Sequence, residues 1–489
     1  MTDSGPGRRE VIGALGLGSL ALAGIPATLR RGTAPTLVQD SQILIQGGRV
    51  INADGARDAD VRIRGETIVE IGPRLQTAPG DRVIDATGML VMPGGIDPHT
   101  HLTGGFIDDL TTGTSAAVAG GITTVGTFAF PGRGETALEA VDRMAGEVAD
   151  QAIGDVMLHG YTWPPTPEYA AMMAGLAERG QPSIKIFMPS RDFGAHTEAV
   201  IALLEEARTH GIVTMIHCED QAMLNAAVRR MEAEGRTSLR YYAESRPDVA
   251  EVVATAQAVG LCELTGAPMH IVHLSSARAL DAARNAHTAD LPLTIETRPL
   301  YLNFTAERFA ESDGPLYVGQ PPLRTDSDVA ALWQGLADGR IDMLATDHAP
   351  WTREQKLDPN LSISRLRPGV SALRFMLPIY FSEGVGKGRI SVERFVETTS
   401  TTPAKTFGLY PRKGVIQEGA DADIIVFDPN RTKAVRAEDD PSNADYSLYE
   451  GWEVTGWPHV VLRRGGTVFD EDRVVASPGT GKLVNRAPR

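Results

Sequence analysis

The chain has 489 residues, enough for one large domain and a smaller one, because a single compact core seldom organises so many. It carries 47 Lys and Arg against 62 Asp and Glu, a formal net charge of -15, and no long basic run, so nucleic acid and anionic membrane surfaces are not expected partners. With only Cys218 and Cys262, and no Cys-x-x-Cys pair, no disulfide framework is expected, and both cysteines are predicted to be buried.

The first 35 residues differ in composition from the rest. Arg8 and Arg9 precede a run rich in Gly, Ala and Leu that extends to about Leu29. The run is too rich in glycine for a permanent membrane span, and the pattern is typical of a twin-arginine export signal. We expect residues 1–35 to direct export to the periplasm or the outside of the cell, with no membrane span left after removal of the signal. The alternatives are a flexible tail, an uncleaved anchor and a cytoplasmic location.

Short stretches of alternating apolar and polar residues predict strands near both ends of the chain. They lie at residues 43–45, 49–51, 61–63, 68–71, 82–85, 423–427, 460–463 and 467–469. Because neither group alone has the strands that a stable sheet needs, residues 40–91 and 413–475 are predicted to form one small β-sandwich domain. Residues 476–489 are predicted to form a C-terminal arm.

Between these groups, apolar strands alternate with helical stretches. The predicted strands are residues 89–92, leading to His101, then 123–130, 155–161, 183–188, 213–217, 270–273, 293–296 and 342–346. Helical spacing of apolar residues predicts helices at 137–151 and 197–209, for example. This alternation predicts an α/β fold, a (β/α)8 TIM-like barrel over residues 92–412, with its chemistry at the C-terminal ends of the strands.

Residues of the metal-ligand type follow several of these strands. His99 and His101 are one residue apart, so in a strand both imidazoles reach one ion while Thr100 points away. Later strands lead to His217, His273 and Asp347. A single histidine at a strand end is more often a hydrogen-bonded structural residue, but this joint placement favours a metal site.

Lys185 lies in the apolar strand Ile184-Lys185-Ile186-Phe187-Met188, where an unpaired ammonium is costly. One explanation is a buried ion pair with Asp or Glu. The other is carboxylation of the amine by CO2, which creates an anionic oxygen ligand able to bridge two ions. Two divalent ions bring four positive charges, of which Asp347, the carbamate and a bridging hydroxide offset three, and four neutral imidazoles complete the ligand set.

The motifs resemble those of the dihydropyrimidinase and hydantoinase branch of the cyclic amidohydrolases. They occur in the expected order at residues 91–102, 184–188, 215–219, 271–275, 321–324, 345–350, 402–414 and 419–423. The resemblance implies two zinc ions, one held by His99, His101, Lys185 and Asp347, the other by Lys185, His217 and His273. It also implies a homotetramer or homodimer, in which the C-terminal arm either reaches a neighbouring subunit or is a disordered tail.

The reaction implied is hydrolysis of a ring amide or imide in a small cyclic substrate. A hydroxide between the two ions attacks the ring carbonyl carbon, and Asp347 carries the proton to the leaving nitrogen. His348 is expected to orient groups around the site.

The residues that contact the substrate depart from the family pattern. Ser190 stands where hydantoinases usually have the Tyr that donates to the substrate oxyanion, and Gln320 stands where Ser is common. Next to Gly369, Ser371 replaces an expected Glu, and Arg298 replaces the Cys of a Cys-Pro-Gln-Tyr segment. We predict Ser190, Gln320 and Gly369 as substrate contacts. Allantoinase, dihydroorotase and a non-catalytic scaffold are the alternative functions, and the retained ligand positions oppose the scaffold.

Overall fold

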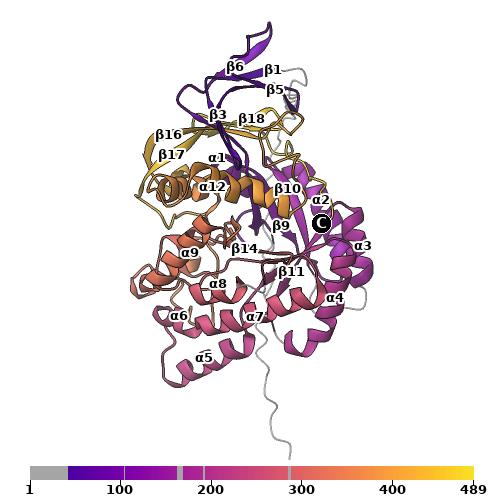
Figure 1. Ribbon diagram of the computed structural model, residues 1–489. Helices are drawn as coiled ribbons and strands as arrows, with labels where there is room; N and C mark the ends of the chain where they lie inside the picture. Colours follow the sequence, from indigo (N-terminus) through magenta and orange to yellow (C-terminus); the bar gives the residue numbers. More distant parts are fainter. Residues whose placement is uncertain (1–41, 104, 162–168, 191–192, 285–287) are drawn as a thin grey trace, which may run out of the picture. The chain divides into compact units, whose positions relative to one another are not determined.

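The computed structural model describes residues 42–103, 105–161, 169–190, 193–284 and 288–489 (Figure 1). The export signal predicted at residues 1–35 lies outside the described residues. In the part of the chain that is described, no helix combines the length and the apolar character needed to cross a membrane.

Eight parallel strands form one sheet in which each strand pairs with the next along the chain. They are β8 (Gly95–Thr100), β9 (Ile122–Ala129), β10 (Asp155–Tyr161), β11 (Ser183–Phe187), β12 (Val213–His217), β13 (Met269–Ile271), β14 (Leu293–Thr297) and β15 (Met343–Leu344). The two edges approach through a bridge between Thr100 and His348, and the Thr346 hydroxyl donates to Asp97 Oδ2 at 2.5 Å. This nearly closed barrel confirms the predicted fold class.

Helices lie outside the barrel strands (Figure 1). Helices α2 (Ala137–Gln151) and α4 (Thr197–Thr209) have the bounds that their periodicity predicts. Helix α2 starts at Thr136, which exchanges hydrogen bonds with Glu139 in a capping box. The other helices are α1 (Leu110–Ala119), α3 (Tyr169–Glu178), α5 (Gln221–Ala233), α6 (Tyr242–Ser245), α7 (Asp248–Thr265), α8 (Ala277–Ala283), α9 (Asp326–Asp338), α10 (Arg353–Lys356), α11 (Met376–Tyr380), α12 (Val392–Val396) and α13 (Thr402–Thr406).

The first predicted barrel strand, residues 89–92, is wrong. Strand β7 (Leu90–Pro93) belongs to a different sheet, and the barrel begins with β8. The chain passes between the two sheets at Gly94, whose amide donates to the Asp423 carbonyl at 2.8 Å. A Cβ at Gly94 would lie 2.2 Å from Thr123 Oγ1, so a side chain does not fit at this passage. Strand β7 is an apolar run, and such a run does not reveal which sheet buries it.

Strands from both ends of the chain pair in one seven-stranded sheet, in the order β19-β18-β17-β16-β7-β2-β3. Its strands, besides β7, are β2 (Arg49–Asn52), β3 (Gly55–Asp58), β16 (Ile424–Ala434), β17 (Glu453–Arg463), β18 (Gly466–Asp470) and β19 (Arg473–Val474). A four-stranded sheet holds β5 (Thr67–Gly72), β4 (Asp60–Arg64), β1 (Gln42–Gln46) and β6 (Asp81–Asp85). Apolar side chains of both sheets, such as Ile63 and Val426, share one buried core. The domain boundaries, residues 40–91 with 413–475 for the small domain and 92–412 for the barrel, stay a prediction.

The last residues of the arm pack against the chain's own barrel. Val156, near the start of β10, donates to the Lys482 carbonyl at 2.9 Å and accepts from the Val484 amide at 2.8 Å. Val484 is buried with Met157 and Met215, which line the barrel interior. The arm therefore covers the N-terminal ends of the strands, which contradicts the alternative of a disordered tail, whereas a contact of the arm with a neighbouring subunit stays a prediction. The sequence alone does not reveal this packing, because Val484 and the backbone groups of the arm find their partners only once the barrel is formed.

Candidate metal centre

The six predicted ligand residues lie at the C-terminal mouth of the barrel. His99 and His101 come from the end of β8, Lys185 from β11 and His217 from the end of β12, while His273 follows β13 and Asp347 follows β15. All six side chains are buried. They meet because parallel strands of a barrel end at one mouth, whatever their separation in sequence.

The distances among these side chains describe one compact cluster. Asp347 Oδ1 lies 3.2 Å from His99 Nε2 and 3.0 Å from His101 Nε2. Lys185 Nζ lies 3.3 Å from His99 Nε2. His99, His273 and Asp347 each offer one ligand atom within 4.8 Å of the others. The rings of His217 and His273 have centroids 4.4 Å apart, so His217 also belongs to the cluster.

Unpartnered nitrogens in the cluster test whether it suits a metal. Nδ1 of His101 and Nδ1 of His273 are buried and have no hydrogen-bond partner among the described residues. Burial lowers the pKa of His99 and of His273 well below the ordinary value, so both imidazoles are neutral and carry a free lone pair. A buried polar atom without a partner is costly, and several neutral imidazoles with a carboxylate suit a divalent ion. The residues present therefore fit a metal.

Two buried glutamates fix the histidines from behind. Glu296 accepts from His99 Nδ1 at 2.5 Å and from the His273 backbone amide at 3.0 Å. Glu219 faces His217 Nε2 at 2.7 Å and is itself paired with Arg246. Such partners select one tautomer and leave the other ring nitrogen free for an ion. Neither glutamate was predicted from the sequence as a positioning group, although Glu296 ends a predicted strand and Glu219 follows His217 by two residues.

Two of the predicted ligands adopt the left-handed backbone conformation that favours glycine. His273 has φ 41° and Asp347 has φ 46°. A non-glycine residue in this region costs about 1–3 kcal/mol, and such strain concentrates at functional sites. Other contacts must stabilise this strained backbone. One of them is the hydrogen bond from the His101 amide to the carbonyl of His348, the residue after Asp347, at 2.7 Å.

Lys185 lacks the counter-charge that a buried ammonium normally has. Within the described residues, no carboxylate lies within ion-pair distance of its Nζ, and the rings of Phe128 and Phe187 lie 5.2 and 5.1 Å away. Burial lowers the pKa of Lys185 to about 8, against the opposing effects of Asp347 and Glu296. The buried ion pair considered from the sequence is therefore absent from the described part of the chain.

Both nitrogens of His348 are occupied away from the cluster. Nε2 lies 2.8 Å from Asp108 Oδ2, and Nδ1 accepts from the Ala372 amide at 3.1 Å. His348 thus ties together segments around the mouth, as expected for an orienting residue.

The three predicted substrate residues come from three separate segments of the chain. The Ser190 hydroxyl is buried without a hydrogen-bond partner among the described residues, so it is available to a ligand. Gly369 has φ 119°, and its amide donates to the Val318 carbonyl at 3.0 Å, two residues before Gln320. A Cβ at Gly369 would lie 2.2 Å from the Ala349 carbonyl oxygen, so glycine is required beside the Asp347 loop. The Gly369 amide therefore binds the segment that contains Gln320, at Val318. No described hydrogen bond joins Gln320 or Gly369 to Ser190.

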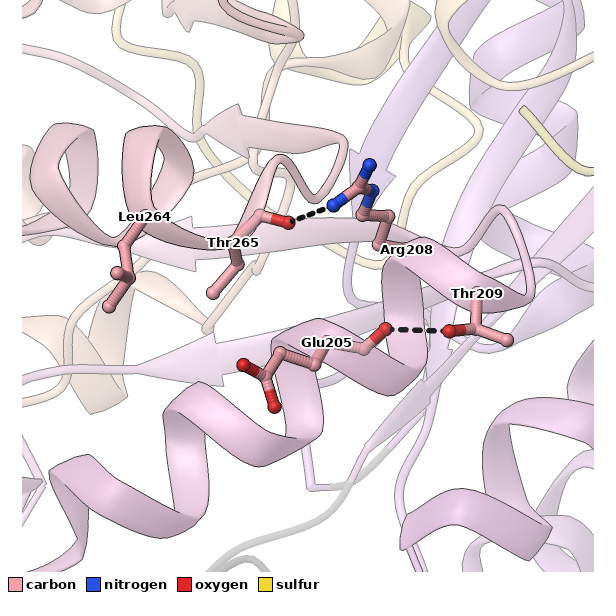
Figure 2. Close-up of a pocket in the computed structure, with 5 residues that line it drawn as sticks. All are labelled: Glu205, Arg208, Thr209, Leu264 and Thr265. Carbon is pink, nitrogen blue, oxygen red and sulfur yellow. Dashed lines mark hydrogen bonds between the residues drawn. The ribbon is translucent and has the colours of Figure 1, made fainter.

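A surface pocket of about 400 Å³ lies elsewhere and is lined by Glu205, Arg208, Thr209, Leu264 and Thr265 (Figure 2). Arg208 Nη1 donates to the Thr265 carbonyl at 3.3 Å, and the Thr209 hydroxyl donates to the Glu205 carbonyl at 3.0 Å. Helices α4 and α7 end here, before β12 and β13 begin, so the pocket is at the N-terminal end of the barrel. It is not part of the metal centre.

A (β/α)8 barrel with buried histidines and an aspartate at its mouth defines the class of metal-dependent hydrolases. The model of the Amidohydrolase family matches residues 90–468. The D-phenylhydantoinase of Escherichia coli O9:H4 (strain HS) is 33% identical over 455 residues, which cover 91% of this chain and 98% of that protein. The chain belongs to the amidohydrolase family, in its dihydropyrimidinase and hydantoinase branch.

Solved structures agree with this membership. The dihydropyrimidinase from Brevibacillus agri has a TM-score of 0.86 at 33% identity, and the D-hydantoinase from Thermus sp. has 0.87 at 34%. The L-hydantoinase from Arthrobacter aurescens has a TM-score of 0.83 at 28% identity. Each similarity covers 91% of this chain and 99% of the other.

Proposed function

We propose that this protein hydrolyses the amide or imide bond of a small cyclic substrate of the dihydropyrimidine or hydantoin type, with two divalent metal ions. The observation that carries the proposal is the buried cluster at the barrel mouth. In it, Nε2 of His99 and of His101 lies 3.2 and 3.0 Å from Asp347 Oδ1, and Nδ1 of His101 and of His273 has no hydrogen-bond partner among the described residues. The names of the relatives, D-phenylhydantoinase and dihydropyrimidinase, support the substrate class.

The ions we propose are zinc, held by His99, His101, Lys185 and Asp347 on one side and by Lys185, His217 and His273 on the other. Bound ions supply Lewis acidity toward water and the ring carbonyl. Lys185 is proposed to bind as a carbamate: its neutral amine adds to CO2, an N–C bond forms and one amine proton is released. The lowered pKa and the missing counter-charge of Lys185 support this reaction.

Asp347 is proposed to move the proton. Its Oδ1 faces the histidines, and its pKa stays below the ordinary value because Arg298 and His101 outweigh the effect of burial. It is therefore a carboxylate that can accept a proton from water and pass it to the leaving ring nitrogen. Ser190, whose buried hydroxyl lacks a partner, is proposed to donate to the substrate. Gln320 and Gly369 are proposed as its further contacts.

The test is ring opening by the full chain loaded with zinc and bicarbonate, with metal content measured on the same sample. Dihydrouracil, 5-substituted hydantoins, allantoin and dihydroorotate separate the hydantoinase reading from allantoinase and dihydroorotase. Asp347→Ala is expected to abolish turnover, whereas His210→Asn, a change at a half-exposed histidine on the end of α4, keeps it. A preparation that binds no metal under any loading condition would instead support a non-catalytic scaffold.

We also propose export through residues 1–35 and a homo-oligomeric state, either tetramer or dimer. Cell fractionation with N-terminal sequencing tests the export, and Arg8→Lys with Arg9→Lys is expected to retain the protein in the cytoplasm. An intact Met1 on native cytosolic protein contradicts export. Light scattering of the purified protein tests the oligomeric state, and a monomeric mass contradicts it.

A further inference from the structure

Arg298 is a buried cation beside the metal centre that is neither a proposed metal ligand nor a proposed substrate contact. It directly follows β14, and its side chain has no exposed surface. Its Nε donates to the Thr346 carbonyl at 3.0 Å, and its Nη2 donates to the Asp347 carbonyl at 3.4 Å. The third nitrogen, Nη1, lies 3.1 Å from Asp347 Oδ2. The whole guanidinium is therefore directed at residues 346 and 347.

These contacts divide the two oxygens of the Asp347 carboxylate. Oδ1 lies 3.2 Å from His99 Nε2 and 3.0 Å from His101 Nε2, while Oδ2 lies against Arg298. A rotation of the carboxylate that brought Oδ2 toward the histidines would break the buried ion pair. Breaking such a pair is costly because it leaves an uncompensated charge in the interior.

The surroundings leave room for the guanidinium. A Cβ at position 319 would lie 2.9 Å from Arg298 Nη1, so Gly319 makes the space that this nitrogen occupies. The ring of Tyr301 lies 5.4 Å from Arg298 Cζ. Nη1 has no aligned hydrogen bond to any described residue, so its contact with Asp347 is electrostatic. The two carbonyl contacts support the left-handed turn at Asp347, which has φ 46°.

We propose that Arg298 is the positioning residue for Asp347: it holds Oδ2, so that only Oδ1 is presented to the ion that His99 and His101 would bind. The inference rests on the proposed metal-dependent function, but its main readout is metal affinity and needs no substrate. Lysine cannot replace arginine here, because a single ammonium cannot donate to both carbonyls and face the Asp347 carboxylate at the same time.

The experiment measures zinc affinity by chelator competition in the full chain, together with kcat and KM on whichever cyclic amide is opened. Arg298→Met is expected to lower zinc affinity and kcat by about 10–100-fold, the usual effect of removing a partner of a metal ligand, with KM little changed. Arg298→Lys is expected to lose affinity at a nearly unchanged melting temperature. Guanidinium ion added to Arg298→Ala is expected to restore part of both quantities.

Arg394 supplies a matched control. Its Nε and Nη2 donate to the carbonyls of Leu336 and Ile341 at 2.6 and 2.7 Å, and its Nη1 pairs with Glu397 at 2.8 Å. Arg394→Met thus removes the same kinds of contact away from the metal centre, and is expected to leave zinc affinity unchanged.

The proposal is overturned if Arg298→Met binds zinc as the wild type does, or if Arg394→Met loses the same affinity. If Arg298→Met fails to fold, Arg298→Lys decides, and a wild-type affinity in that variant overturns the proposal. A wild type that binds two ions but opens none of the cyclic amides refutes the proposed function, while the effect of Arg298 on metal affinity still stands or falls by itself.

Discussion

Replacing Glu296 tests whether the carboxylates behind the histidines, and not the ligands alone, maintain the metal centre. Glu296 is fully buried and accepts from three donors: His99 Nδ1 at 2.5 Å, His270 Nε2 at 2.9 Å and the His273 amide at 3.0 Å. In Glu296→Ala all three donors lose their acceptor. In Glu296→Gln one oxygen remains for His99 and His273, and only the contact with His270 changes.

The magnitudes differ because the number of unpaired donors differs. A buried donor without a partner costs about 1–3 kcal/mol, so Glu296→Ala loses on the order of 3–9 kcal/mol. That is a large share of the ~5–15 kcal/mol that stabilises a typical domain. In Glu296→Gln, His270 adopts the other tautomer, because its Nδ1 lies 2.9 Å from the Thr294 hydroxyl, which can accept. The cost is then about 1.5–3 kcal/mol, the value of one hydrogen bond to a charged group.

The assay combines urea unfolding of the metal-free protein with zinc affinity from chelator competition. Glu296→Gln is expected to fold and to bind zinc about 10–100-fold more weakly, because His99 is no longer oriented by a charged partner. Asp342→Asn is the control: Asp342 accepts from the Ile295 amide at 2.7 Å and pairs with Arg284, and neither contact involves a predicted ligand, so this change affects stability alone. Wild-type zinc affinity in Glu296→Gln would refute the reasoning.

Three further outcomes are expected. Lys413→Met removes a buried cation that lies 2.8 and 2.5 Å from the carboxylates of Asp155 and Asp423. Asp155 keeps Arg464 at 3.1 Å, but Asp423 loses its ion pair, so the unfolding free energy should fall by about 3–5 kcal/mol with unchanged zinc affinity; an unaltered urea midpoint contradicts this. Burial opposes ionisation of Glu219, but Arg246 and His217 outweigh it and lower its pKa from 4.5 to about 2. The stability it contributes is therefore complete above pH 4.5 and lost as pH falls toward 2; urea titrations of the metal-free protein should show this loss, reduced in Glu219→Gln. Prolonged chelation should remove activity, and zinc with bicarbonate should restore it more fully than zinc alone; equal recovery without CO2 contradicts the carbamate.

Local sequence patterns predicted most elements because burial and capping act over a few residues. Helices α2 and α4 have their predicted bounds, and strands β10 and β12 also match residue for residue. Alternation located the strands at both ends of the chain, although β16 and β17 extend farther than predicted. Elements whose burial depends on a distant partner were assigned less well: β7 pairs with β16, more than 300 residues away, and not with the barrel.

The predicted ligand residues were visible in the sequence because five of them lie at or just after strand ends and have side chains suited to a metal, while Lys185 is a lysine inside an apolar strand. Their partners were not visible as such. Glu296 and Arg298 have ordinary sequence surroundings, and their roles come from contacts with residues of distant strands at 2.5 and 3.1 Å, whereas Glu219 contacts His217, its neighbour two residues away. The C-terminal arm is similar, since Val484 becomes a core residue only where the barrel offers Met157 and Met215.

By itself, the sequence determined the alternation of strands and helices, the barrel class and the six candidate ligands, because periodicity and residue type are local properties. The tertiary structure decided which sheet received β7, which nitrogen of each histidine stayed free, and that Arg298 lies against Asp347 Oδ2. Those features depend on distances between strands that are far apart in the chain, and such distances exist only after the barrel has formed.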